Sequence, residues 1–259
     1  MEELLPMMQK AAPILALTMV RLSAFLLLVP VLSDPGPPRQ ARLALLLVLG
    51  GVVFAIRGFG MRDPVPDSFI LGAMSEMATG LWMGFILRTL FEVVALIGHI
   101  MGFEMGLGFT AAVDPINGQQ SIVITTLYRY TTALLFLSSG ALHSILLSLV
   151  SSYDIVEMGS LGFERFTELA WQAVELFRVT LHIGLALVAP MLIVSFCLSI
   201  GIALLARMVQ GFQVLELGFP MRILVGFLVV WLSLPHLLPA LNALFEQMNT
   251  RLIEGLQGS

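Results

Sequence analysis

Residues 97–115 read IGHIMGFEMGLGFTAAVDP, and this stretch decides the fold. Gly98, Gly102 and Gly106 recur every four residues, so a helix carries them as one stripe of small residues on one face. In an apolar segment such a stripe lets a second backbone approach closely, which is how helices associate without a hydrophobic driving force. The stripe then runs into Asp114-Pro115 and a polar turn. We therefore expect a helix built for close packing, followed by a turn that carries function.

The composition of the whole chain is that of a membrane protein. Of its 259 residues, 58% are hydrophobic and 12% are charged, which is roughly half the charge of a soluble domain. Apolar runs recur that are long enough to cross a hydrocarbon layer of ~30 Å, which takes about 20 residues. They are continuous rather than alternating with period two, unlike the strands of a membrane β-barrel. The sequence predicts an all-α, polytopic helical membrane protein with kinked helical hairpins, in one integral membrane domain over 1–259.

Turns with proline or charged residues divide the chain into seven hydrophobic segments and a tail. Proline interrupts helices because it lacks the backbone donor and clashes with the preceding turn. Pro190 is expected to kink the sixth segment, and Gly218-Phe219-Pro220 and Pro235 to interrupt the seventh. The expected segments are about 13–32, 41–56, 68–87, 89–113, 121–150, 169–207 and 212–245, with a short surface helix over 246–259. A second close-packing pair, Gly80 and Gly84, lies in the third segment.

Ionisable side chains occur inside these apolar segments, where each costs about a few kcal/mol at mid-bilayer and normally marks a function. The candidate buried charges are Glu76, Glu92, Glu104, Arg129, Glu175 and Arg178. Arg21 and His99 also lie inside apolar segments. Two interpretations stay open: the charges form a proton or ion path, or they hold helices and subunits in register.

The sequence contains no signature of an enzyme. It has no His-Glu-x-x-His metal motif, no Gly-x-Ser-x-Gly elbow and no phosphate-binding loop. Its four histidines lie on separate segments without ligand spacing. A net charge of −4 with the single lysine Lys10 offers no basic patch for nucleic acid. We expect a protein that is not an enzyme and that uses no cofactor, metal or nucleic-acid partner.

The stretch from Gly98 to Pro115 resembles the hallmark of the flagellar biosynthetic protein FliR family. A second similarity lies toward the C-terminus, where Ala206-Arg207 is followed by Gly218-Phe219-Pro220 and Leu232-Ser233-Leu234-Pro235. The length and the order of the hydrophobic segments are also similar from end to end. The T-subunit of injectisome type III secretion systems shares the fold of this family and is the alternative within it.

The resemblance implies an export-gate subunit fold and a place in the bacterial inner membrane, in the flagellar basal body. The implied partners are FliP and FliQ, which complete the closed channel, together with FlhB, unfolded export substrates and membrane lipid. Within the chain, residues 1–165 would be the FliP-like part and 166–259 the FliQ-like helical pair.

The resemblance also implies two sets of site residues. The family's channel plug maps to the loop after Met105-Gly106-Leu107, with the plug residues Phe109, Val113, Asp114, Pro115, Asn117, Gly118 and Gln119. Subunit packing is expected at Gly98, Gly102, Met105, Gly106, Gly218 and Pro220.

Two functions of other classes remain as rivals. A proton-coupled small-molecule transporter would use Glu76, Glu104 and His99, and it predicts inverted internal repeats that the sequence does not show. An intramembrane hydrolase predicts a nucleophile–base pair, for which the sequence offers no spacing.

Overall fold

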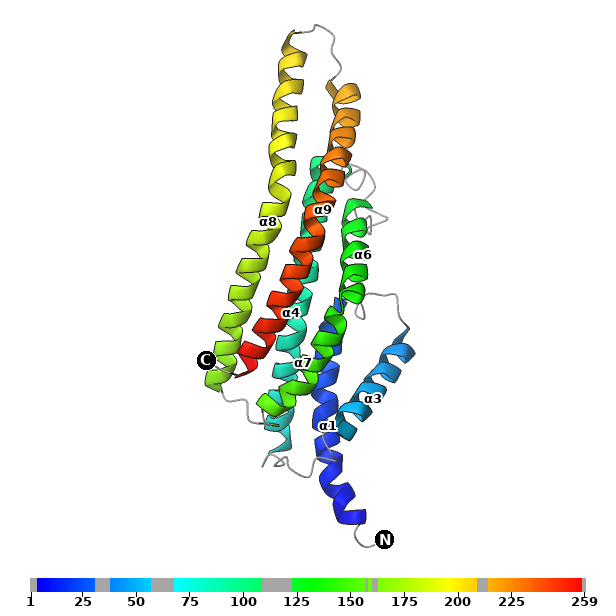
Figure 1. The fold of residues 1–259 in the computed structure, drawn as a ribbon, viewed down its shortest axis with the longest axis vertical. Coiled ribbons are helices and arrows are strands. Elements are labelled where there is room, and N and C mark those ends of the chain that lie inside the picture. Colours follow the sequence, from blue (N-terminus) through cyan, green and yellow to red (C-terminus); the bar gives the residue numbers. More distant parts are fainter. Residues whose placement is uncertain are drawn as a thin grey trace. The chain divides into compact units, whose positions relative to one another are not determined.

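The computed structural model describes residues 4–30, 38–56, 68–108, 123–156, 158–159, 163–208 and 214–257. Within these ranges the regular secondary structure is helical, and Figure 1 shows the helices in chain order. The helices are α1 (Leu4–Leu28), α3 (Arg39–Ile56), α4 (Phe69–Glu104), α6 (Val123–Ser138), α7 (Ala141–Ile155), α8 (Phe163–Met208) and α9 (Val214–Gln257). The predicted all-α class is confirmed.

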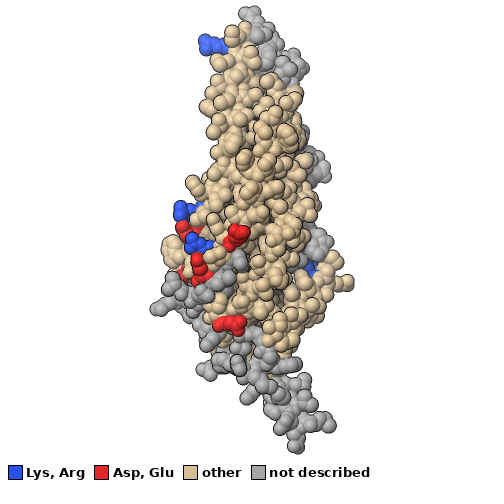
Figure 2. All heavy atoms as spheres, viewed as in Figure 1, with Lys and Arg blue, Asp and Glu red and all other residues tan. Residues whose placement is uncertain are grey.

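Five of the described helices, α1, α3, α4, α8 and α9, are long and apolar enough to cross a membrane. α6 and α7 pass the same test together, as one broken span. Charged side chains cover little of the surface shown in Figure 2. The predicted polytopic membrane protein is therefore confirmed.

The chain forms two compact units. The first contains Met1–Thr89, Gly140–Phe177 and Glu246–Ser259, and the second contains Leu90–Ser139 and Arg178–Phe245. α4, α8 and α9 each contribute residues to both units, so the units share helices instead of following one another along the chain.

In the first unit α4 lies directly against α1 because two glycines leave no side chain at the contact. A Cβ atom on Gly84 would lie 2.8 Å from the Cβ of Leu28 and 2.9 Å from the carbonyl oxygen of Phe25. A Cβ on Gly80 would collide with the carbonyl oxygen of Arg21. The predicted close packing at Gly80 and Gly84 is confirmed, and α1 supplies the partner backbone.

α3 contacts α1 through a narrow part of its surface. Its buried residues are Gly50 and Val53, and Met19 of α1 fills the space beside Gly50. Most of the other side chains of α3 are apolar and exposed, among them Leu47 and Val48. This helix therefore presents a broad apolar surface outside the unit.

In the second unit, aromatic rings join α4, α6 and α9. The ring of Phe136 lies 5.5 Å, centroid to centroid, from both Phe91 and Phe245. α8 approaches α4 at Gly184, where a Cβ would lie 2.6 Å from Cγ1 of Val93. The parts of α8 and α9 in this unit run side by side as a hairpin, drawn yellow and orange in Figure 1. Together they form the framework that holds the end of α4.

Two of the predicted segment boundaries are wrong. The third and fourth segments are one helix, α4, because Arg88 and Thr89 at the expected boundary are both tolerated in a helix. The Thr89 hydroxyl donates to the carbonyl of Phe85, as it does inside a continuous helix. The fifth segment instead breaks at Gly140, whose φ of 77° leaves the helical region.

The prolines of the last segment do not interrupt it. α9 runs through Pro220, Pro235 and Pro239, and the tail after Phe245 continues the same helix as far as Gln257. Proline removes one donor each time, and packed membrane helices tolerate this where neighbouring groups satisfy the freed carbonyls. The predicted interruptions and the separate surface helix are therefore wrong.

Candidate functional site

α4 ends in a Schellman turn, which fixes the direction in which the chain leaves the helix. The N–H of Leu107 donates to the carbonyl of Gly102 at 3.1 Å, and the N–H of Gly106 donates to Phe103 at 2.9 Å. Gly106 has a φ of 79°, the left-handed conformation that glycine adopts without strain. The helix predicted to reach Val113 therefore ends at Glu104.

Three consecutive residues at this end contact the α8–α9 hairpin of the same unit. The hydroxyl of Ser195 in α8 donates to the carboxylate of Glu104. Met105 is fully buried, and its side chain occupies the space where a Cβ on Gly226 of α9 would lie. A Cβ on Gly106 would lie 3.0 Å from the ring of Phe219. We call Glu104, Met105 and Gly106 the α4 anchor.

A small pocket beside the α4 anchor contains two opposite charges, Glu104 and Arg222. The guanidinium of Arg222 donates to the hydroxyl of Ser199 at 3.0 Å. Ser199 donates in turn to the carbonyl of Ser195, one helical turn earlier, at 2.8 Å. Ser195 and Ser199 of α8 thus connect the carboxylate of Glu104 in α4 to the guanidinium of Arg222 in α9. Sequence reasoning missed them, although two serines at i,i+4 inside an apolar run are a usable signal.

The residues assigned to the plug lie in the stretch 109–122, outside the described residues: Phe109, Val113, Asp114, Pro115, Asn117, Gly118 and Gln119. The structure describes the chain up to Gly108 and again from Val123. The last described residues before this stretch are the α4 anchor and the two residues that follow it, Leu107 and Gly108.

The residues expected to pack against other subunits mostly contact their own chain. A Cβ on Gly98 would lie 2.9 Å from the Cα of Thr125 in α6, and Gly102 is buried. Gly218 is also buried, near Ile202 of α8, whereas Pro220 is exposed. Within this chain α6 covers Gly98 and α9 covers Gly106, and the packing of these residues against a partner subunit stays a prediction.

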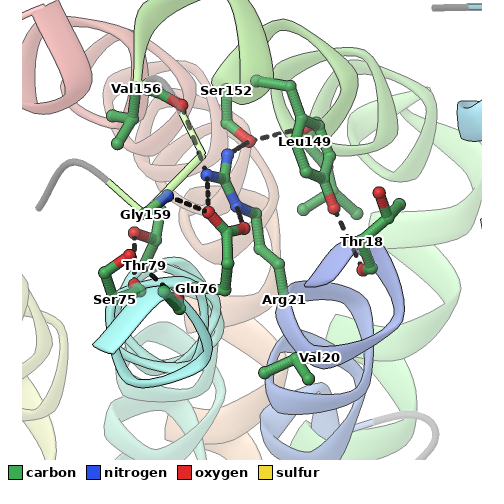
Figure 3. Close-up of polar contacts among 12 residues, drawn as sticks. Thr18, Val20, Arg21, Ser75, Glu76, Thr79, Leu149, Ser152, Val156 and Gly159 are labelled. Carbon is green, nitrogen blue, oxygen red and sulfur yellow. Dashed lines mark hydrogen bonds and ion pairs between the residues drawn. The ribbon is translucent and has the colours of Figure 1, made fainter. Parts of the chain in front are cut away.

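A buried ion pair joins Arg21 of α1 to Glu76 of α4, and both residues are 0% exposed (Figure 3). Nε of Arg21 lies 2.6 Å from Oε2 of Glu76, and Nη2 lies 3.0 Å from Oε1. The same guanidinium donates to the hydroxyl of Ser152 at 3.0 Å and to the carbonyl of Val156 at 3.3 Å. The N–H of Gly159 donates to Oε1 of Glu76 at 3.2 Å.

An aromatic ring completes this cluster. The guanidinium carbon of Arg21 lies 4.1 Å from the ring centroid of Tyr153, within the range of a cation–π interaction. The Tyr153 hydroxyl donates to the carbonyl of Thr18 at 3.2 Å. We call Arg21, Glu76 and Tyr153 the α1–α4–α7 clamp. The role of the clamp is structural, because each of its charged groups is bound by other groups of the protein.

The remaining candidate charges differ from Glu76. Glu104 is half-buried, and Glu175 and Arg178 are exposed on α8. Glu92 and Arg129 form an ion pair at 3.7 Å with side chains 51% and 48% exposed. Side chains of this chain do not bury these last four residues, and their burial in an assembly stays a prediction. Glu76 was identified from the sequence, but its partner Arg21 lies 55 residues away and no local spacing connects them.

Among the described residues, no group of three or more His, Cys, Asp or Glu side chains is placed to hold a metal ion. The site is thus built from packing, hydrogen bonds and ion pairs.

Comparison with known proteins gives a consistent result over most of the chain. Residues 12–248 match the family described as bacterial export proteins, family 1. The flagellar biosynthetic protein FliR of Bacillus subtilis is 26% identical over 223 residues, which cover 84% of this chain and 85% of the relative. The protein of that name from Aquifex aeolicus is 28% identical over 225 residues, 85% of each chain. That from Escherichia coli is 27% identical over 234 residues, 89% of this chain and 87% of the relative.

These relatives are named for flagellar biosynthesis, and none of the three is named for a catalysed reaction. The resemblance seen in the motifs of the sequence is confirmed by a match that extends over nearly its whole length. The chain belongs to family 1 of the bacterial export proteins.

Proposed function

We propose that this chain is an inner-membrane subunit of the flagellar type III protein export gate. With FliP and FliQ it forms the closed channel for unfolded flagellar proteins, in contact with FlhB, and residues 109–120 contribute the plug. The family match, the FliR relatives and the membrane-spanning helices support its more general role as a membrane component of the flagellar export apparatus.

The way α4 ends carries the argument for the plug. A plug closes a channel only while it stays in position, so the chain that leads into it has to be held in place. α4 is continuous for 36 residues, its end is closed by the Schellman turn, and Glu104, Met105 and Gly106 each contact α8 or α9. The proposed plug segment follows this anchor directly in the sequence.

The relatives favour a flagellar role over the injectisome alternative, because the three described above are FliR proteins and match over most of their length. The transporter alternative is weakened by the environment of Glu76. A proton-coupled carboxylate has to exchange protons with water, whereas Glu76 is fully buried and bound to Arg21 through both of its oxygens.

Deleting 116–120 tests the plug role. We expect the shortened subunit to co-purify with FliP and FliQ as the intact one does, while the membrane that contains the complex becomes permeable to ions. Gly51→Ala serves as the control, since a Cβ at Gly51 has nothing within 4 Å and both readouts should stay unchanged. A membrane that remains tight after the deletion contradicts the plug role. Failure of the intact chain to co-purify with FliP and FliQ contradicts the proposed assembly.

A further inference from the structure

We propose that the α8–α9 hairpin positions the plug segment by holding the α4 anchor, and that Ser195 is the positioning residue. This inference rests on the proposed plug role and adds to it the part of the subunit that controls where the plug begins.

The contacts of the anchor leave little freedom before the plug segment. Met105 is fully buried against α9, and Gly106 contacts the ring of Phe219. Leu107 is tied to Gly102 by its backbone N–H. Gly108 alone separates these fixed residues from Phe109. A shift of α8 or α9 within the unit therefore changes the position and direction of the backbone as far as Gly108, the residue that precedes the plug segment in the sequence.

The hydrogen bond from Ser195 is the polar part of this attachment. Among the described residues, Ser195 supplies the hydrogen bond to the carboxylate of Glu104. The neighbouring side chains of the pocket include Met191, Val194 and Val225, which cannot replace that donor, and Arg222, whose guanidinium donates to Ser199 instead. A carboxylate next to apolar groups costs free energy when it has no hydrogen-bond donor. Without the Ser195 hydroxyl, the Glu104 side chain is therefore expected to turn toward water. Glu104 is the last residue of α4, so its movement loosens the turn that follows it.

Ser199 provides a matched control on the same helix. It is one turn away from Ser195, has the same side chain and contacts the same pocket through Arg222. Its hydroxyl donates to the Ser195 carbonyl inside α8. Replacing Ser199 by alanine thus removes a hydroxyl of equal size without touching the donor to Glu104.

The test compares Ser195→Ala, Ser195→Thr and Ser199→Ala in the complex with FliP and FliQ. Hydrogen exchange of the amides of Met105, Gly106 and Leu107 reports on the anchor, and ion permeability of the membrane reports on closure. For Ser195→Ala we expect exchange faster by about tenfold, as for the loss of one hydrogen bond to a charged group. We also expect a leaking membrane and an unchanged yield of complex. Ser195→Thr keeps the hydroxyl and should restore both readouts, and Ser199→Ala should resemble the parent protein.

Each outcome has a defined meaning. Unchanged exchange in Ser195→Ala overturns the positioning role, as does equally fast exchange in Ser199→Ala. Faster exchange with a tight membrane also overturns it, provided that deletion of 116–120 leaks. If that deletion itself leaves the membrane tight, the plug role of the proposed function fails. The exchange data then still decide whether Ser195 holds the end of α4.

Discussion

At the scale of single residues, the α1–α4–α7 clamp shows how a charged pair is accommodated inside a membrane protein. Arg21 and Glu76 bind each other through two contacts, and Ser152, Val156 and Gly159 satisfy further donors and acceptors. Buried pairs of this kind add little net stability compared with apolar residues of the same shape, but losing one partner leaves an uncompensated buried charge.

Removing one member of the clamp should therefore be worse than removing both. We expect Glu76→Leu to destabilise the folded state by about 3–5 kcal/mol, and Arg21→Met/Glu76→Leu to cost clearly less. Thermal unfolding of the purified complex in detergent measures both. A double variant as unstable as the single one would show that the other contacts of the clamp, not the unpaired charge, dominate.

At the scale of helices, the glycine stripe of α4 is a contact between elements of one chain. Gly98 brings α4 against the backbone of α6, and Gly80 and Gly84 bring the earlier part of the same helix against α1. The sequence predicted the close approach from spacing alone. It did not identify the partner, because a stripe of small residues specifies a short interhelical distance and not which helix fills it.

Alanine substitutions separate a crowded glycine from an open one. A Cβ on Gly98 would lie 2.9 Å from a backbone atom, Cα of Thr125, which cannot move aside cheaply. We expect Gly98→Ala to destabilise the protein by about 1–3 kcal/mol, the usual effect of overpacking. Gly51→Ala, with open space around it, should be neutral or stabilising by up to about 1 kcal/mol, because alanine favours the helix. Thermal unfolding distinguishes the two, and equal shifts would refute the contact.

The breaks in the helices were harder to predict than the helices themselves. Proline in the sequence predicted interruptions at Pro220 and Pro235, yet α9 is continuous there. The helix ends that do occur, at Glu104 and Ser138, are each followed two residues later by a glycine with a positive φ, Gly106 and Gly140. Glycine permits that conformation without requiring it, so composition alone does not reveal the turn. The contacts of Glu104 and Arg21 with distant residues depend on tertiary packing, which no local spacing records.

At the scale of the whole molecule, the described helices expose apolar side chains over much of their surface. Leu47 on α3, Phe196 on α8 and Trp231 on α9 are each more than 60% exposed. Water is a poor solvent for such a surface, whereas lipid or the helices of a partner cover it without cost.

Extraction from membranes tests this surface directly. We expect the chain to remain in the membrane pellet after washing with alkaline carbonate, which releases peripheral proteins, and to appear in solution only after detergent is added. A peripheral membrane protein in the same sample serves as the control. Release by carbonate would contradict the assignment of membrane-spanning helices.

The clamp also bears on the order in which the subunit is made. Arg21 leaves the ribosome early, but the Val156 carbonyl, which accepts a hydrogen bond from its guanidinium, lies 135 residues further along the chain. At synthesis rates of about 5–20 residues per second, this interval is roughly 7 to 27 s. In the part of this interval that follows Glu76, which is made 55 residues after Arg21, an ion pair between α1 and α4 lacks its partners from α7. The N-terminal helices therefore acquire the complete clamp only when α7 is inserted, and the first unit is complete only once Glu246–Ser259 has been made.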